Sequence, residues 1–294
     1  MIEHDQDPVQ KQSPSNDRQL MTCPPFSPDK LKRELWIDSA SRWSAVILIM
    51  LVILIFQTGL SSMDFWLLMI PVIILWVAIS APSAKVLPIL PQITQWLDQD
   101  LPAAENAIAQ GLARRPLHRQ LRIQLYHRLA IVRHYQTRID ESAAIAQTLL
   151  SMSLGASEVH RPQLLLILVE SRLLRNDLVG AYAGLNELSR LRLGLLESLQ
   201  HLALRTRYEV AAGYHTMALA DLPRKIHYAQ MLPAPQCGSL HLLLAAAAQQ
   251  VNDPALYDWL MRRAQLLCEP KVLEEFQQGR LAFGVEKPLT IAPL

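Results

Sequence analysis

Two uncharged apolar runs, each long enough to cross a bilayer, stand next to each other near the N-terminus. They read WSAVILIMLVILIFQTGL over Trp43–Leu60 and FWLLMIPVIILWVAISAP over Phe65–Pro82. As a helix, each would extend about 27 Å, close to the thickness of a bilayer core. Two successive uncharged runs of this length exceed what a soluble helical hairpin needs. A cleaved signal peptide would follow a shorter polar leader. The runs therefore predict a transmembrane hairpin over residues 36–83, with spans at about 43–60 and 65–82.

The charges around these runs predict the topology. Basic residues lie on the outer flanks of the hairpin, whereas the connecting loop carries only Asp64. The basic residues are Lys30, Lys32, Arg33, Arg42 and Lys85. Lysine and arginine are retained on the cytoplasmic side of a membrane. We expect an integral, multi-pass protein with two spans and both termini in the cytoplasm.

The two ends of the chain resemble tails rather than domains. The first 28 residues are rich in Asp, Gln, Ser and Pro and show almost no apolar periodicity. Such a segment cannot offset its ordering entropy by burial. We predict a disordered N-terminal tail over residues 1–35 and an irregular C-terminal tail over residues 284–294.

The intervening residues 84–283 predict an all-α domain, because Leu, Ala, Gln and Arg are abundant and apolar residues recur at the helical period. Polar breaks interrupt these stretches at intervals of 40, 37, 38 and 38 residues. They fall at Asp100, Asp140, Asp177, the turn 213–215 and Asp253. A fixed interval of this size indicates repeated helix pairs that stack into an α-solenoid, here about five of them. Aspartate suits such breaks as a helix N-cap, and residues 271–283 would cover the end of the stack.

One unit of this repeat carries a family resemblance. Residues 165–188 read LLILVESRLLRNDLVGAYAGLNEL, with the turn Arg175-Asn176-Asp177 between two helices and with Ala181 and Leu185 as small and large packing positions. Residues 103–116 repeat the pattern more weakly. The chain thus resembles tetratricopeptide-like (TPR) repeat proteins over roughly residues 98–270. That resemblance implies a concave groove that binds a peptide segment of another protein.

Motifs of catalysis, metal binding and phosphate binding are missing from the sequence. The nine histidines form no H-E-x-x-H motif, and Cys23, Cys237 and Cys268 are far apart and in no C-x-x-C arrangement. No nucleophile elbow, phosphate loop or dinucleotide fingerprint is found. We expect no enzymatic activity, no metal and no cofactor. A net charge of +2 also gives no reason to expect nucleic acid as a partner.

A cluster of arginines is the strongest candidate for a binding site. Seven lie between residues 106 and 139 without any acidic residue. On one helix Arg119, Arg122, Tyr126 and Arg133 would fall within a sector of roughly 60°, opposite a leucine stripe. Three interpretations stay open: a solvated face whose arginines meet acidic residues of adjacent helices, a groove for an acidic protein or peptide partner, or a contact with anionic lipid headgroups.

The function predicted from these features is a membrane-anchored helical-repeat scaffold that mediates protein–protein interaction at the cytoplasmic membrane surface. Two alternatives remain: an enzyme with a nonstandard site in the helical domain, and a lipid-contacting subunit of a membrane assembly.

Overall fold

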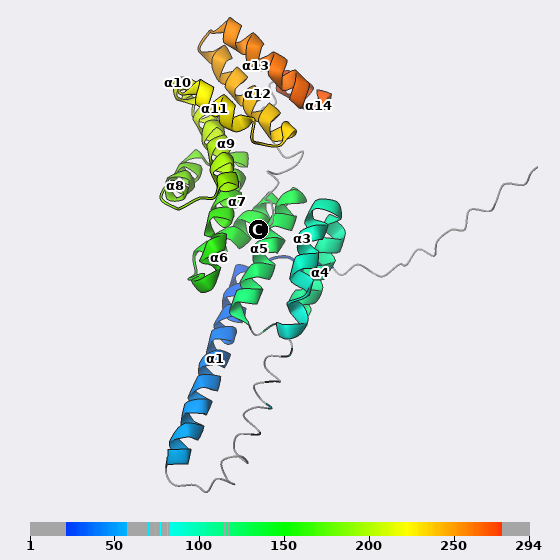
Figure 1. The fold of residues 1–294 in the computed structure, drawn as a ribbon, viewed down its shortest axis with the longest axis vertical. Helices are drawn as coiled ribbons and strands as arrows, with labels where there is room; N and C mark the ends of the chain where they lie inside the picture. Colours follow the sequence, from blue (N-terminus) through cyan, green and yellow to red (C-terminus); the bar gives the residue numbers. More distant parts are fainter. Residues whose placement is uncertain are drawn as a thin grey trace, which may run out of the picture.

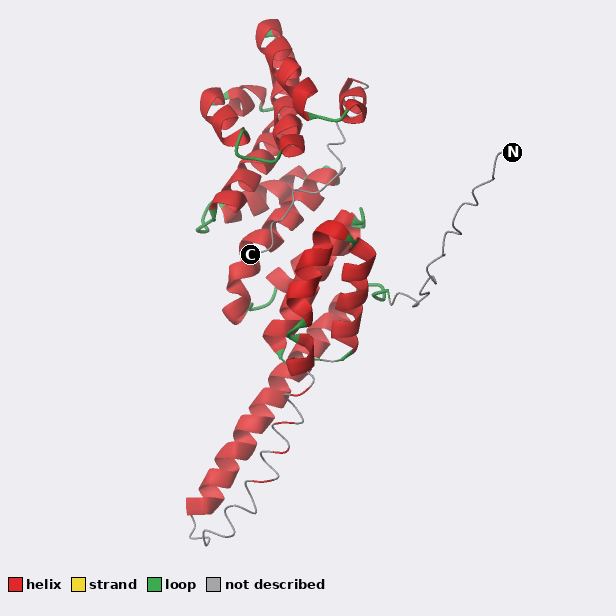
Figure 2. Cartoon of the chain, turned by 45° about the vertical axis from the view of Figure 1, so that its right-hand side comes forward, coloured by secondary structure: helices red, strands yellow, loops and turns green. Residues whose placement is uncertain are grey.

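All secondary structure in the described part of the chain is helical, which confirms the predicted all-α class (Figure 2). The computed structural model describes residues 22–57, 83–114, 116 and 118–277, together with residues 70, 74, 77 and 81. The longer helices are α1 (Pro28–Gln57), α3 (Ile89–Gln99), α4 (Leu101–Ala113), α5 (Arg119–Tyr135), α6 (Ile139–Leu150), α7 (Arg161–Leu174), α8 (Leu178–Leu188), α9 (Leu195–Ala211), α12 (Ala234–Gln250) and α13 (Pro254–Leu267). Shorter ones are the 3₁₀ helix η1 (Gly155–His160), α10 (His215–Leu219), α11 (Leu222–Ala229) and α14 (Pro270–Gln277).

Successive helices pair and stack along the chain. Helix α3 packs on α4, α5 on α6, α7 on α8 and α12 on α13, and α9 is followed by the short helices α10 and α11. Each pair also contacts the next, through α4 and α5, α6 and α7, α7 and α9, and α9 and α12. The result is an elongated stack, from which α1 projects as a rod at the end opposite α12–α14 (Figure 1).

The turn between the two helices of a pair has the same geometry four times. Thr137, Asn176, Gly213 and Asn252, 39, 37 and 39 residues apart, have positive φ angles. The N–H of the next residue donates to the carbonyl five positions earlier, over 2.7–3.0 Å. This is the Schellman arrangement, in which one residue in the left-handed region reverses the chain and satisfies carbonyls at the helix end. A local device repeated at this interval explains the regular spacing of the four polar breaks after Asp100.

Aspartates cap the second helix in three of the pairs. Asp100, Asp177 and Asp253 accept hydrogen bonds from the backbone N–H groups of Ala103, Gly180 and Leu256 at 2.9–3.0 Å. These bonds satisfy donors that the first turn of a helix cannot pair internally. Asp140 departs from the expected pattern. It lies inside the first turn of α6, where Arg138 occupies the cap position, and its carboxylate meets Arg175 instead.

The apolar interior consists of three neighbouring clusters rather than one continuous core. The first joins residues 23–35 to α3–α7, the second joins α7, α8 and α9, and the third joins α9 to α14. Helices α7 and α9 each supply side chains to two clusters. On α7, Leu164 and Ile167 face one cluster, whereas Leu165 and Val169 face the next. These two helices therefore hold the stack together, because both sides of each are covered.

The N-terminal part of the chain differs from its predicted disorder. Residues 22–27 form no helix or strand but pack against the stack through Cys23, and α1 begins at Pro28, inside the segment 1–35 that was expected to be disordered. Cys23, Leu31 and Leu35 are buried in the first cluster. The composition of the tail is poor in apolar residues, but these three find a complementary surface on the stack. Residues 1–21 lie outside the described residues.

The predicted hairpin is described only in part. The first span, 43–60, falls largely on the second half of α1, which is one helix of 30 residues reaching from Pro28 to Gln57. Most of the second span, 65–82, lies outside the described residues. Among the helices that are described, none meets the length and hydropathy expected of a membrane span.

The end of the stack is covered by α14, which packs Val272, Leu273 and Phe276 against the third cluster. A last helix was predicted over residues 271–283. Its described part begins at Pro270 and ends at Gln277, and residues 278–294, with the predicted C-terminal tail, lie outside the described residues.

Candidate functional site

The predicted arginine stripe lies on α5, where the stack covers it. Arg122, Tyr126 and Arg133 are 5%, 8% and 1% exposed. Arg119 is half-buried and donates to the carbonyl of Ser153. The stripe is therefore not an open face opposite the leucines, because α1, α4 and α6 pack around α5 and bring carboxylates to it.

Arg122 and Tyr126 bind the first turns of α1. The Arg122 guanidinium contacts Glu34 at 3.3 Å and Asp38 at 3.2 Å, and it also donates to the carbonyl of Pro116 at 3.0 Å. The Tyr126 hydroxyl donates to the same Glu34 carboxylate at 3.2 Å. Glu34 and Asp38 are one helical turn apart, so both carboxylates face α5 together. This contact fixes the base of α1 on the stack.

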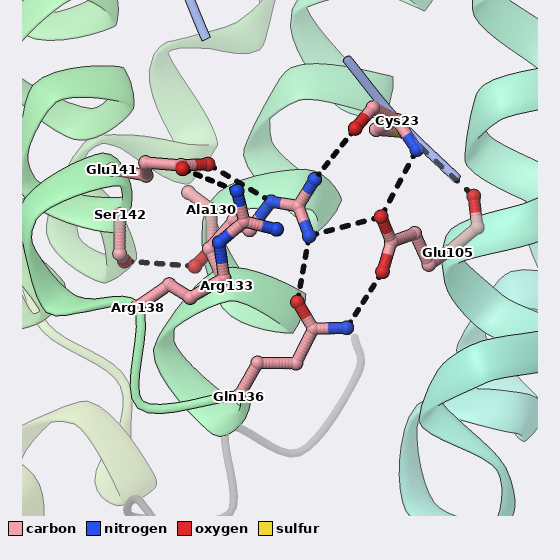
Figure 3. A network of polar contacts seen from close by, with 8 residues as sticks. All are labelled: Cys23, Glu105, Ala130, Arg133, Gln136, Arg138, Glu141 and Ser142. Atoms are coloured by element: carbon pink, nitrogen blue, oxygen red, sulfur yellow. Dashed lines mark hydrogen bonds and ion pairs between the residues drawn. The ribbon is translucent and has the colours of Figure 1, made fainter. Parts of the chain in front are cut away.

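Arg133 forms a second junction, which holds the segment before α1 (Figure 3). Its guanidinium contacts Glu105 of α4 at 2.9 Å and Glu141 of α6 at 3.2 Å. It also donates to the side-chain oxygen of Gln136 at 2.7 Å and to the backbone carbonyl of Cys23 at 3.1 Å. One cation thus joins α4, α5, α6 and the N-terminal segment.

Glu105 completes this junction from the other side. Its carboxylate accepts hydrogen bonds from the Cys23 backbone N–H at 3.0 Å and from the Gln136 amide at 2.7 Å. Burial alone would raise the pKa of Glu105, but the hydrogen bonds from Gln136 and Cys23 and the charge of Arg133 outweigh it and hold the pKa below its usual value. Burial, together with the negative charge of Glu105, raises the pKa of the Cys23 thiol to about 11. This thiol is therefore protonated at neutral pH and is a poor nucleophile.

The lowered pKa of Glu105 predicts that the free energy of unfolding depends on pH. Because its folded-state pKa is lowered, its contribution to stability is complete above the unfolded-state pKa of about 4.3 and is lost as the pH falls through the folded-state value. We expect the difference in unfolding free energy between the wild type and Glu105→Gln to be largest near pH 7 and to shrink below about pH 4.3. Denaturant unfolding at a series of pH values measures this difference. A difference that is constant from pH 7 to pH 3 would contradict the assignment.

Two buried histidines of α5, His127 and His134, contact side chains of neighbouring elements in the stack. His134 Nε2 lies 3.0 Å from a carboxylate oxygen of Glu170 on α7, and the rings of His127 and His160 stack with centroids 4.7 Å apart. Burial lowers the pKa of His127 to about 3, with contributions from His160 and Arg128, so this ring is neutral. In the described part of the chain no three His, Cys, Asp or Glu residues gather as metal ligands would.

Sequence reasoning identified the arginines but not the carboxylates that meet them. Glu34 and Asp38 lie 88 and 84 positions before Arg122, so no local pattern connects them. One signal could have revealed α1: Pro28 and Asp29 are typical of a helix start, and Leu31, Leu35 and Asp38 then share one face. The acidic residues that the first interpretation expected do meet Arg122 and Arg133, but these two arginines are buried and do not form a solvated face. A direct role of Arg119, Arg122, Tyr126 and Arg133 in binding a partner stays a prediction.

In comparisons with known proteins, no family model matches the chain, and neither a curated protein nor a solved structure is significantly similar to it.

Proposed function

We propose that this chain is a membrane-anchored scaffold whose tetratricopeptide-like helical stack binds another protein near the cytoplasmic face of a bilayer. The anchor is the hairpin 36–83, and the stack is the binding part. The observation that supports this proposal most strongly is the contrast along α1, whose first turns bury one face with Leu31, Leu35 and Asp38 and whose remaining turns expose large apolar side chains.

The exposed part of α1 has the surface of a lipid-facing helix. Its large apolar side chains are between about a third and two thirds exposed, and they point in several directions around the helix. They are Trp43, Val46, Ile47, Leu48, Met50, Leu51 and Leu54. A contiguous apolar surface of this kind marks a membrane or protein contact in a folded protein. An apolar surface that covers more than half of the helix circumference favours lipid over a single partner groove.

The ionic junctions give the anchor a mechanical role. Glu34 and Asp38 fix the first turns of α1 to Arg122 on α5, so the apolar rod continues directly from the stack rather than from a flexible linker. An anchor of this type holds the stack at a defined distance from the bilayer. Restriction to a surface also raises the effective concentration of the stack toward other membrane-bound proteins.

The stack offers side chains suited to a protein partner. Tyr182 of α8, Tyr208 of α9 and Tyr214 form a row in which ring centroids are 5.7 and 6.4 Å apart. Tyr182 and Tyr214 are more than half exposed. Tyrosine is enriched at protein interfaces because it supplies a large contact area and a hydroxyl at a low entropic cost.

Site-specific photocrosslinking in native membranes tests this proposal. A benzophenone amino acid in place of Leu54 is expected to yield lipid adducts, whereas the same residue in place of Tyr182 is expected to yield a discrete protein adduct. Gln265, which is exposed on α13 and does not belong to the tyrosine row, is the matched control position. A lipid adduct at Leu54 without any protein adduct in the stack would support the anchor and refute the scaffold. Absence of lipid adducts at Leu54 would refute the anchor.

A further inference from the structure

The segment before α1 lies on the stack in the manner of a bound peptide. Residues 22–27 form no helix or strand, and two of their side chains, Cys23 and Phe26, are buried or half-buried. Cys23 is buried in the first apolar cluster, and the Phe26 ring meets the Tyr126 ring edge-on, with centroids 6.2 Å apart. The side chains of Thr22, Pro24, Pro25 and Ser27 are exposed. The surface therefore distinguishes one small side chain and an aromatic ring three positions later.

The backbone of this segment is recognised at one residue. The Cys23 N–H donates to Glu105 and the Cys23 carbonyl accepts from Arg133, so both main-chain groups of that residue are paired with α4 and α5 (Figure 3). Pro24 and Pro25 have no N–H to satisfy and restrict the chain to an extended form. Main-chain pairing combined with side-chain selection at alternate points is a general mode of peptide recognition.

The surface that receives the segment is held together by its own residues. Arg133 pairs with Glu105 and Glu141, and Gln136 bridges Arg133 and Glu105 through two hydrogen bonds. None of these contacts involves residues 22–27. Departure of the segment would thus expose one acceptor and one donor position to water and leave the buried charges paired with each other. A preformed site of this kind binds its ligand at a low reorganisation cost.

We propose that Glu105, Arg133, Gln136 and Tyr126 form a peptide-docking site, that residues 22–27 are its intramolecular occupant, and that a partner protein displaces them. The partner presents an extended segment of the same chemistry, with a small side chain, two prolines and then an aromatic residue. The site requires no charge on the ligand, because Glu105 and Arg133 form hydrogen bonds with its neutral N–H and carbonyl groups. This inference rests on the proposed function, since it names the partner class of the scaffold.

A peptide-exchange measurement on the full chain in detergent tests the proposal. The probe is a fluorescent peptide with the sequence of residues 20–28, LMTCPPFSP, under reducing conditions. In the variant Cys23→Arg/Phe26→Ala the intramolecular occupant is weakened while every residue of the docking site is retained. We expect this variant to bind the peptide at least about tenfold more tightly than the wild type does, because a tethered competitor acts at a high effective concentration.

Control peptides separate specific docking from adhesion without any change to the protein. A peptide that is N-methylated at its cysteine loses the donor to Glu105, and a peptide with alanine for its phenylalanine loses the contact with Tyr126. Both are expected to bind the variant at least about tenfold more weakly than the parent peptide. Equal binding of all three peptides, or equal affinity of wild type and variant for the parent peptide, would overturn the proposal.

Light scattering tests the other possible occupant of the site, the N-terminal segment of a second copy of the chain. If wild type is a dimer and Cys23→Arg/Phe26→Ala a monomer, the site binds the N-terminal segment of a second copy, which contradicts a separate partner protein. A monomeric wild type is the expected result. All of these measurements use detergent-purified chain, so they do not depend on anchoring. Lipid adducts at Leu54 together with failed peptide exchange would refute the docking site alone.

Discussion

Arg133→Leu is expected to destabilise the chain by about 3–5 kcal/mol, the cost of removing one partner from a buried ion pair. The leucine leaves Glu105 without its cation in a site where that carboxylate is almost completely buried, and it removes the donor to the Cys23 carbonyl. Chemical denaturation in detergent, followed by tryptophan fluorescence, measures the change. The loss should also appear as faster hydrogen exchange of the Cys23 amide, which Glu105 binds.

Arg138→Leu is the matched control. Arg138 also pairs with Glu141, but its side chain is 41% exposed. Exposed ion pairs contribute at most about 1 kcal/mol, so the control should be close to the wild type. In the double variant Arg133→Leu/Glu105→Leu the two losses should be less than additive, since the carboxylate that would be stranded is gone. Equal destabilisation by Arg133→Leu and Arg138→Leu would contradict the central place of Arg133 in the junction.

The double variant Leu51→Arg/Leu54→Arg is expected to release the chain from membranes. Both leucines are more than half exposed on the apolar part of α1. An arginine near the middle of a spanning helix costs about 2.5–3.5 kcal/mol on insertion scales, so two such changes together oppose insertion by about 5–7 kcal/mol. Alkaline carbonate extraction followed by centrifugation measures the retained fraction, which should fall from nearly all of the protein to a minor share.

Leu266→Arg provides the control for this experiment. Leu266 is 86% exposed on α13, in the helical stack, and the control replaces it by arginine as well. Its retention in the membrane fraction should equal that of the wild type. If carbonate releases the wild-type chain intact, or if the α1 variant remains in the pellet as fully as the control, α1 does not anchor the protein in lipid.

The order of helices along the chain follows from local signals that the sequence carries. Asp100, Asp177 and Asp253 start helices by accepting backbone hydrogen bonds within three residues. Asn176, Gly213 and Asn252 end the preceding helices by adopting positive φ. Such devices act between close neighbours in the chain, so their spacing can be recognised without any knowledge of the tertiary structure. The exception is instructive: Asp140 has the right spacing but pairs with Arg175 on another helix.

The role of the arginines could not be decided in the same way. Their helical spacing predicted a shared face, and Arg122, Tyr126 and Arg133 do lie on α5, but spacing says nothing of what covers that face. The Cys23 carbonyl that Arg133 binds is 110 positions away in the chain, and the hydroxyl of Tyr126 meets a carboxylate 92 positions away. Contacts of that separation depend on how helices pack, and no local pattern encodes them.

By itself, then, the sequence determined that this is an all-helical chain of paired helices with an apolar segment near its N-terminus, because helix period, caps and turns are properties of short stretches. Only the tertiary structure decided that residues 22–35 are ordered and that the arginines of α5 are buried. The physical reason is the same for both. A segment with few apolar residues, and a cation with no acidic neighbour in sequence, become stable only where packing supplies a complementary surface from a distant part of the chain.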